Sequence, residues 1–466
     1  MVEDLKRVEA EAVGDIWVNS EAYKNLLVLC DQYGSRFAGT KGEKPAVNYM
    51  VSKLREYSLE NVTADPFTYV GWKRGSAKFE LLKPVKRDLP AISLPLCPSG
   101  IVEGEVIDLG NGDPLEFKRR EKEIAGKIVM CTSAPGAGGR EVHRRTKYGY
   151  GVAFGAKGFI FGNHNPGQLL VTGSLRPAYR MAGEIPAVGV SWETVSFILR
   201  LMEKGKVNIR IRTTDKVIPN STSWNVSGEI PGSILKDHFI VIGGHFDGHD
   251  ISQGAMDDAS GACVVMEVAR ALAKFKGSFK RSLRFLCFAA EEMGVTGSTC
   301  YVAKHQGEMG KVDLMVNCDG AGRATRHTFR VSGPLELIKF LQTIAEEMGY
   351  PMNVGSSLST ASDHWPFYVQ RVPAVSYASA PDPLIAPIVA AQGRGFGHTS
   401  ADTVDKVDHR GLKEAAMVLA QFVMRLANID EISSRMSLKE IVEYLEQRGV
   451  AEELRIQKKW HPETVR

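Results

Sequence analysis

Three apolar runs in the second half of this chain each end on side chains that can carry charge or bind a metal. HFIVIGGH ends on His245, SLRFLCFAAEE ends on Glu291 and Glu292, and VDLMVNCD ends on Asp319. Short, continuous apolar runs of this kind indicate buried strands. Because the ligands of an open α/β sheet gather at the carboxyl ends of its strands, we expect these four side chains to lie in one crevice.

Two loops supply further candidates for the same crevice. Asp257 lies in GAMDDASG, just before a strong helical pattern, and His398 lies in the polar turn GFGHTSADT. Each of these residues alone has a more common structural role, such as a helix cap or a solvated loop. Six residues of suitable type, all at the ends of buried segments, are much harder to explain in that way.

The residue types favour a site for two zinc ions. Imidazole and carboxylate groups suit zinc, and two ions about 3.5–4 Å apart share a bridging ligand. We place His245 and Asp319 on one ion. Glu292 and His398 then hold the other, so that each ion has one nitrogen and one terminal carboxylate. Asp257 remains as the shared ligand.

Two more acids are expected to act beside the metals. The base that takes a proton from the attacking water must not itself be a ligand, and Glu291, next to Glu292, fits this role. Asp247, two residues after His245, is placed to accept the second ring N–H of that histidine and to fix its tautomer.

Six motifs resemble, in order and spacing, those of peptidase family M28: GGHFD, GAMDDASG, AAEEMGVTGS, NCDG, SDHWPF and GHTSADT. These co-catalytic zinc exopeptidases include bacterial aminopeptidases and the carboxypeptidase Q group. The resemblance covers roughly residues 1–100 and 218–428. It implies the same five ligands with Asp257 as the bridge, and Glu291 as general base and then acid. It also implies a cis peptide bond after Asp257, with Asp258 turned away from the metals toward a neighbouring loop.

The segment after His245 departs from the family pattern. It reads FDGHDISQGAMDDASG, so that His249 and Asp250 are additional polar residues near the site. For His249 we expect a hydrogen-bonding role within the loop rather than a role as a third metal ligand.

The sequence indicates the substrate pocket less directly than the metal site. Ser362, Asp363 and His364 in SDHWPF are expected pocket walls, although a tight turn before the next strand explains them almost as well. An aminopeptidase must hold the ammonium group of its substrate, whereas a carboxypeptidase or dipeptidase needs a cation for the substrate carboxylate. Arg394 and Arg323 are the candidates for that cation.

Changes in composition divide the chain into three parts. We predict a catalytic domain of residues 1–101 and 215–430, with the α/β fold of a mixed β-sheet sandwiched by helices. An insertion at 102–214 has short β-like runs such as GKIVMCT and IPAVGVS between glycines, and it resembles a mainly β protease-associated domain. Residues 431–466 are expected to form a helical extension that covers the chain's own surface or, as the less favoured alternative, a second subunit.

Composition argues against several other classes of function. The net charge of +4 is too small and too dispersed for a nucleic-acid partner, and no stretch approaches the ~20 apolar residues of a membrane span. The glycine strings lack the lysine of a P-loop, and we interpret the basic runs KRREKE and RRTK as solvated faces. Seven cysteines without a CxxC pair are typical of reduced thiols. We therefore expect a cytoplasmic protein, unless a leader peptide has been removed.

Together these features predict an exopeptidase with two Zn²⁺ ions, for which Co²⁺ or Mn²⁺ are possible substitutes. The expected substrate is a peptide, and aminopeptidase is the favoured activity. The first alternative is a carboxypeptidase or dipeptidase of the carboxypeptidase Q type. A glutaminyl cyclase-like acyltransferase and a binding protein without catalysis are less favoured alternatives, and a homodimer is left open.

Overall fold

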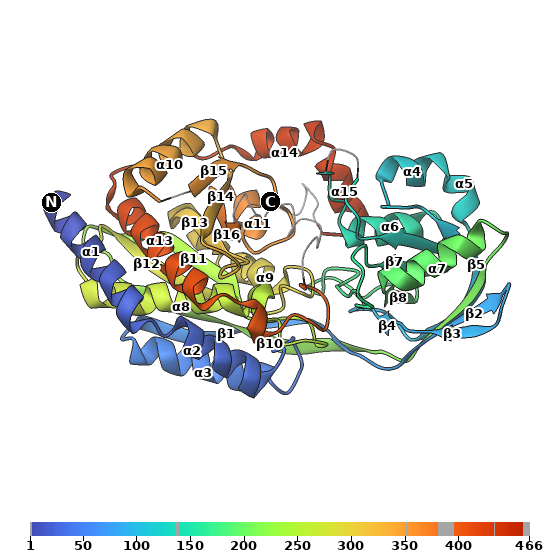
Figure 1. Ribbon diagram of the computed structural model, residues 1–466. Coiled ribbons are helices and arrows are strands. Elements are labelled where there is room, and N and C mark those ends of the chain that lie inside the picture. Colours follow the sequence, from blue (N-terminus) through green and yellow to red (C-terminus); the bar gives the residue numbers. More distant parts are fainter. Residues whose placement is uncertain (1, 137–138, 351, 381–395, 433, 460–466) are drawn as a thin grey trace.

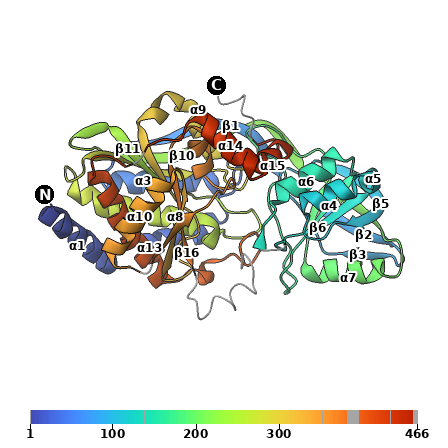
Figure 2. The same cartoon turned by 90° about the horizontal axis from the view of Figure 1, so that it is seen from above.

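The computed structural model describes residues 2–136, 139–350, 352–380, 396–432 and 434–459. They form two sheets, each covered by helices, and the last helices of the chain lie where the two parts meet (Figures 1 and 2). Among these residues, no helix has the length and apolar character needed to cross a membrane.

The first sheet has eight strands, and its centre is parallel while its margins include antiparallel pairs. In spatial order the strands are β1 (Glu60–Lys73), β10 (Lys216–Ile230), β12 (Arg281–Phe288), β11 (Leu235–His245), β13 (Val312–Cys318), β16 (Ala374–Ala380), β14 (Arg326–Ser332) and β15 (Met352–Ser356). The mixed sheet predicted from the sequence is confirmed. Because β12, β11 and β13 are parallel neighbours, their carboxyl ends meet at one edge.

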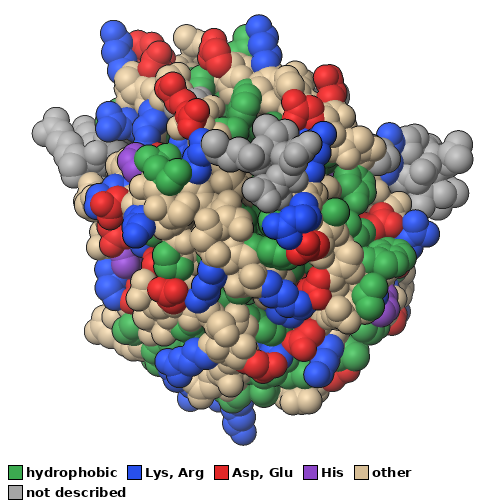
Figure 3. Space-filling view, turned by 90° about the vertical axis from the view of Figure 1, so that its left-hand side faces the viewer, with side chains coloured by type: hydrophobic (Ala, Val, Ile, Leu, Met, Phe, Trp, Pro, Cys, Tyr) green, Lys and Arg blue, Asp and Glu red, His purple; other side chains and the backbone are tan. Residues whose placement is uncertain are grey.

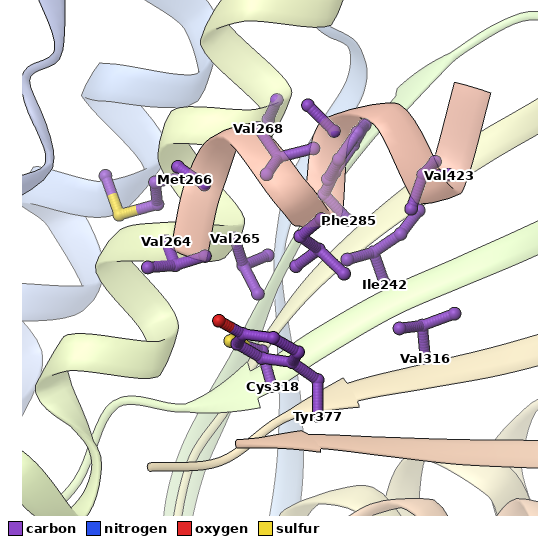
Figure 4. Packing of buried hydrophobic residues seen from close by; sticks show 14 of the residues in the cluster. Ile242, Val264, Val265, Met266, Val268, Phe285, Val316, Cys318, Tyr377 and Val423 are labelled. Atoms are coloured by element: carbon purple, nitrogen blue, oxygen red, sulfur yellow. The ribbon is translucent and has the colours of Figure 1, made fainter. Parts of the chain in front are cut away.

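Two layers of helices cover this sheet. One layer contains α1 (Val2–Asn19), α2 (Ala22–Leu27), α3 (Glu43–Glu56), α8 (Ser260–Leu272), α10 (Leu335–Met348) and α13 (His409–Asn428). The other contains α9 (Thr296–Lys304), α11 (His364–Val369) and α14 (Leu438–Gln447). Successive strand residues face opposite layers, so that Ile242 packs with Val265 and Val423 in the first layer (Figure 4), while Val241 belongs to the second.

The second sheet belongs mainly to the insertion. Its strands, in spatial order, are β3 (Arg87–Leu89), β2 (Ala77–Lys83), β9 (Asn208–Thr213), β5 (Gly100–Asp108), β6 (Ile128–Thr132), β7 (Gly158–Gly162), β8 (Ala187–Val190) and β4 (Ile92–Ser93). Its helices are α4 (Pro114–Arg119), α5 (Glu121–Ile124), α6 (Arg144–Ala153) and α7 (Trp192–Met202). The sheet extends past the boundary predicted at residue 102, because β2 pairs with β9 and β4 pairs with β8. These long-range pairings carry no local signal in the sequence.

The C-terminal extension connects the two parts. Ile441 and Leu445 of α14 are buried in the second helical layer of the main sheet. The following helix, α15 (Val450–Ile456), contacts α6 of the insertion, and Leu454 is fully buried. Both overall views show α15 beside α6 (Figures 1 and 2). The extension thus covers the chain's own surface, which is the alternative that the sequence favoured.

One basic run was interpreted wrongly from the sequence. RRTK begins α6, and its Arg144, Arg145 and Lys147 are 5%, 3% and 1% exposed rather than solvated. The helix is enclosed by the rest of the insertion, by α15 and by the main domain, and this tertiary contact cannot be recognised from the charges alone. On the face that Figure 3 shows, by contrast, Lys and Arg side chains are interspersed with Asp and Glu.

All seven cysteines are free thiols in the structure, and all except Cys300 are buried.

Candidate metal centre

The polar residues predicted at the strand ends come together at the edge where β11, β12 and β13 end. His245 is the last residue of β11, Glu291 and Glu292 follow β12, and Asp319 directly follows β13. Loop residue His398 also reaches this edge, because its Nε2 lies 3.2 Å from Glu292 Oε2. The structure thus brings these five side chains together at the edge where the sequence placed them.

The potential metal ligands form two compact groups. In each group the ligand atoms all lie within 4.8 Å of one another. The first group is His245, Asp258 and Asp319, and the second is His249, Glu292 and His398. Each expected pair of terminal ligands therefore falls in its own group.

Asp257 lies between the two groups. Its Oδ1 is 3.5 Å from His245 Nε2 in the first group, and its Oδ2 is 3.4 Å from His398 Nε2 in the second. A carboxylate that presents one oxygen to each group has the geometry of a bridging ligand. The peptide bond between Asp257 and Asp258 is cis, as the family resemblance implied.

Asp258 only partly follows the expectation that it turns away. Its Oδ1 accepts hydrogen bonds from the backbone N–H of Gly320, at 2.8 Å, and of Gly261, at 3.2 Å. Its Oδ2 is buried without a hydrogen-bond partner among the described residues, and the side chain remains within the first group. Burial, followed by the charge of Asp319, raises the pKa of Asp258 well above its usual range.

Asp247 organises the site differently from the prediction. Its carboxylate accepts hydrogen bonds from the backbone N–H groups of Glu291, at 3.1 Å, and Glu292, at 3.3 Å. His245 Nδ1 lies 3.0 Å from the backbone oxygen of Asp247 and 3.4 Å from its carboxylate. The ring is therefore oriented chiefly by a carbonyl, while the carboxylate fixes the turn that carries both glutamates.

Two supporting contacts were not recognised in the sequence. The carboxylate of Asp402, in the GHTSADT motif, accepts hydrogen bonds from the backbone N–H of Met256 at 2.8 Å and of Asp257 at 3.2 Å. Thr172 of the insertion pairs with His398: its oxygen lies 3.2 Å from His398 Nδ1, and its N–H donates to the His398 oxygen at 2.9 Å. Because Thr172 acts through its backbone, its residue type gives no signal.

The pKa values of the two buried glutamates are shifted in opposite directions. Burial raises the pKa of Glu291 well above its usual range, although the charge of His245 opposes this. Burial would also raise the pKa of Glu292, but the nearby His249 and His398 outweigh it and lower that pKa. Glu292 is therefore favoured as an anion, the form in which a carboxylate can bind a metal, whereas Glu291 is the more readily protonated of the two.

The SDHWPF residues lie behind the site rather than around an open pocket. Ser362 donates a hydrogen bond to Asp319 Oδ2 at 2.6 Å and accepts one from Asn317 Nδ2 at 2.7 Å. Asp363 is fully buried and accepts a hydrogen bond from Ser298, and burial raises its pKa to about 7. His364 begins α11 and is also buried.

A cavity of about 650 Å³ opens beside His398, between the insertion and the main domain. It is lined by α6, by the segment 356–361, by His398 and by residues of α15 and its flanks. Arg144 and Lys147 contribute to its wall, and Arg144 Nη1 lies 3.5 Å from His398 Nδ1. A space of this size beside the two groups of ligands is within the range of small-molecule binding pockets.

The basic residues near the centre are not those expected from the sequence. Arg394 lies outside the described residues, and Arg323 is exposed, with Nη2 3.4 Å from the Met256 oxygen. Instead, Arg145 of α6 and Lys459 of the extension are both 3% exposed, and each interacts electrostatically with Glu291. Lys459 donates to the Thr360 oxygen. In the sequence, the run RRTK was the only feature that could have indicated basic residues near the centre.

Comparisons with known families agree with this architecture. Residues 225–423 match the model of peptidase family M28, and residues 100–197 match that of the PA domain. Carboxypeptidase Q of Mus musculus is 26% identical over 433 residues, which cover 89% of this chain and 87% of that protein. Leucine aminopeptidase 2 of Trichophyton equinum is 26% identical over 393 residues, which cover 80% of this chain and 74% of that protein.

Two solved structures share the overall fold. A peptidase M28 precursor from Shewanella amazonensis has a TM-score of 0.77 at 22% identity, with 94% of this chain and 100% of that chain covered. The aminopeptidase from Aneurinibacillus sp. strain AM-1 has a TM-score of 0.66 at 24% identity, with 89% and 95% covered. At these identities the likeness establishes the fold, including the insertion.

Proposed function

Since this chain is a metallopeptidase of family M28 with an inserted PA domain, we propose that it is a two-zinc exopeptidase that hydrolyses the terminal bond of short peptides. The observation that carries the proposal is the position of Asp257, with one oxygen facing each group of ligands. A site for one ion would give no reason for a second buried group of nitrogen and oxygen donors.

The chemistry of the two groups fits zinc. Both consist of imidazole nitrogen and carboxylate oxygen, the protein ligands of many catalytic zinc sites. Glu292 Oε1 and Asp258 Oδ2 are buried without hydrogen-bond partners among the described residues, a costly arrangement unless a cation lies nearby. When bound, zinc polarises a substrate carbonyl and lowers the pKa of water.

Glu291 is the residue that moves the proton in this proposal. Its Oε2 lies 4.0 Å from His245 Nε2, so it borders the first group without belonging to either group. It takes a proton from water as the new carbon–oxygen bond forms, and it gives that proton to the amine nitrogen as the peptide bond breaks. Asp247 fixes the backbone at Glu291 and so keeps the carboxylate in place.

Two candidate activities differ in the end of the peptide that the enzyme recognises. The first candidate is aminopeptidase activity, as the sequence favoured. A specific observation favours the second, a carboxypeptidase or dipeptidase that recognises a free carboxylate. Arg145, Lys147 and Lys459 are buried near the centre, and none forms an ion pair with a carboxylate within the described part of the chain.

The charges around Arg145 and Lys459 explain why these side chains would bind the carboxylate of a substrate. Arg145 and Lys459 interact with each other as like charges, and among the nearby carboxylates Glu291 offsets the charge of each most strongly. Once metal ions neutralise the ligand carboxylates, these cations attract a further anion, and the carboxylate of a short peptide fits. The relatives named carboxypeptidase Q agree with this candidate.

Substrate profiling tests the proposal. The zinc-loaded protein is assayed with three sets of peptides: aminoacyl amides, N-blocked peptides and free dipeptides. Hydrolysis that requires a free amine but tolerates an amide supports the aminopeptidase, and hydrolysis that requires a free carboxylate supports the second candidate. Cyclisation of N-terminal glutamine with a single bound metal, or no turnover at all, would contradict the proposal.

We also propose that the protein acts in the cytoplasm, since its seven thiols are all unpaired.

We further propose that Co²⁺ or Mn²⁺ can substitute for zinc, because both ions accept imidazole and carboxylate ligands. Metal analysis of the purified protein tests the identity of the ion.

A further inference from the structure

We propose that His249 is a third protein ligand of the metal ion held by Glu292 and His398, so that this ion is bound more tightly than its neighbour. The inference rests on the proposed two-metal function and adds a residue to its ligand set. His249 departs from the family motif, and from the sequence we expected only a hydrogen-bonding role within the loop.

The contacts of His249 point into the second group. Its side chain is 1% exposed, and Nε2 lies 2.8 Å from Glu292 Oε2. Its ring meets the His398 ring edge to face, with centroids 4.4 Å apart. Neither ring nitrogen has a hydrogen-bond partner of normal geometry among the described residues. The imidazole therefore makes none of the expected hydrogen bonds within the loop in the described structure. Only the backbone oxygen of His249 does so, by accepting from Ser252.

A shared cation explains this convergence. Two imidazole nitrogens and a carboxylate oxygen lie within 4.8 Å of one another, and Glu292 Oε1 also has no hydrogen-bond partner in the described structure. Lone pairs that face one point in a buried site repel each other unless a cation or a proton lies between them. A metal ion at the centre satisfies all three donors. The competing explanation is a proton shared by His249 and Glu292. That proton would not explain why His398 Nε2 also lies close to Glu292 Oε2.

The loop that carries His249 is held on both sides. The backbone N–H of Gly248 donates to the Ser35 oxygen at 2.8 Å, and Asp250 accepts two hydrogen bonds from Arg74, at 2.6 and 2.7 Å. Gly248 also packs so closely on Gly254 that a Cβ there would lie 2.4 Å from the Gly254 Cα. The imidazole is thus placed by a fixed backbone, as a preformed metal ligand requires.

The extra ligand makes the two ions unequal. With the bridging Asp257, the second group supplies four protein ligands, the number found in closed tetrahedral zinc sites. The first group supplies His245 and Asp319 with the same bridge, while one oxygen of Asp258 is already used by two backbone amides. An ion at the first group would therefore keep a position open for water, and an ion at the second group would be the last that a chelator removes.

Stepwise removal of metal tests this inequality. Protein loaded with two equivalents of zinc is dialysed against increasing chelator, and its metal content is measured by mass spectrometry. The wild type is expected to lose one ion well before the other. In His249→Phe the affinity for the retained ion should fall by more than about 100-fold, beyond the 10–100-fold typical of residues that only support a ligand. His327→Phe is the matched control, since His327 is buried at 2% exposure in β14 and belongs to neither group.

Two further variants separate a ligand from a hydrogen-bond donor. His249→Cys keeps a zinc-binding atom and should restore much of the retention, whereas His249→Asn keeps an N–H donor and should not. In the Co²⁺-loaded protein, visible absorption should report fewer ligands in His249→Phe and His249→Asn. Restoration by Asn, or an unchanged Co²⁺ spectrum in both variants, would overturn the inference. A wild type that binds only one ion would instead contradict the proposed function.

Discussion

The catalytic centre has two walls of different origin. Its metal-binding wall comes from the ends of neighbouring strands in one sheet, where His245, Glu292 and Asp319 lie. Its basic wall comes from α6 of the insertion and from the C-terminal extension, which contribute Arg145 and Lys459. The first wall is built by parallel strands of one sheet, each followed or ended by a polar residue, and the second by the packing of the insertion against the C-terminal extension. We therefore propose that the sheet supplies the chemistry and that the insertion and the C-terminal extension select the substrate.

The largest effect is expected on the metal-binding wall. Asp257→Ala removes the oxygens that face both groups, so we expect loss of metal and loss of all measurable hydrolysis. Metal content is measured beside activity, with circular dichroism as the check of folding. A folded variant that keeps both ions would show that Asp257 is not the bridge.

Glu291→Gln separates chemistry from metal binding on the same wall. The amide cannot accept the proton, so kcat should fall by ~10²–10⁴-fold while metal content stays near that of the wild type. Glu292→Gln is the neighbouring comparison and should lose metal. Equal loss of metal in the two variants would contradict the separate roles.

Variants of the basic wall should change selection rather than chemistry. Arg145→Met removes a charged hydrogen-bond donor, which is worth about 1.5–3 kcal/mol, or ~10–100-fold in binding. Lys459→Met removes an amine whose pKa is lowered well below its usual range by burial and by the charge of Arg145, so that a bound carboxylate would restore its charge. We expect KM for free dipeptides to rise by that factor, with little change for the corresponding amides. Lys122→Met, on the exposed surface of the insertion, is the control. Similar changes for both substrate types would assign the two cations a structural role only.

The smallest effect is a dependence on pH at the same wall. Burial lowers the pKa of Lys147 to about 8. The amine is therefore charged below pH 8 and neutral above it, so KM for free dipeptides should rise severalfold as the pH increases through this value. In Lys147→Arg the charge persists, and this rise should disappear. If the rise is unchanged in Lys147→Arg, another group is responsible.

The same contrast explains what the sequence could predict. His245, Glu292 and Asp319 follow apolar runs, and such runs reveal both a buried strand and the edge where it ends. The contribution of Lys459 depends on how α15 packs against α6, and the pairing of β2 with β9 depends on contacts far along the chain. RRTK was misinterpreted because charges on a helix usually face solvent, and only the surrounding packing shows that these do not.

Asp257 is proposed to join two metal ions at the edge of the main sheet. A crystal structure of the zinc-loaded protein, with anomalous scattering measured at the zinc edge, tests this claim most directly. We expect two peaks about 3.5–4 Å apart, each within about 2.0–2.2 Å of one Asp257 oxygen. A single peak, or two peaks with Asp257 outside the coordination of either, would contradict it.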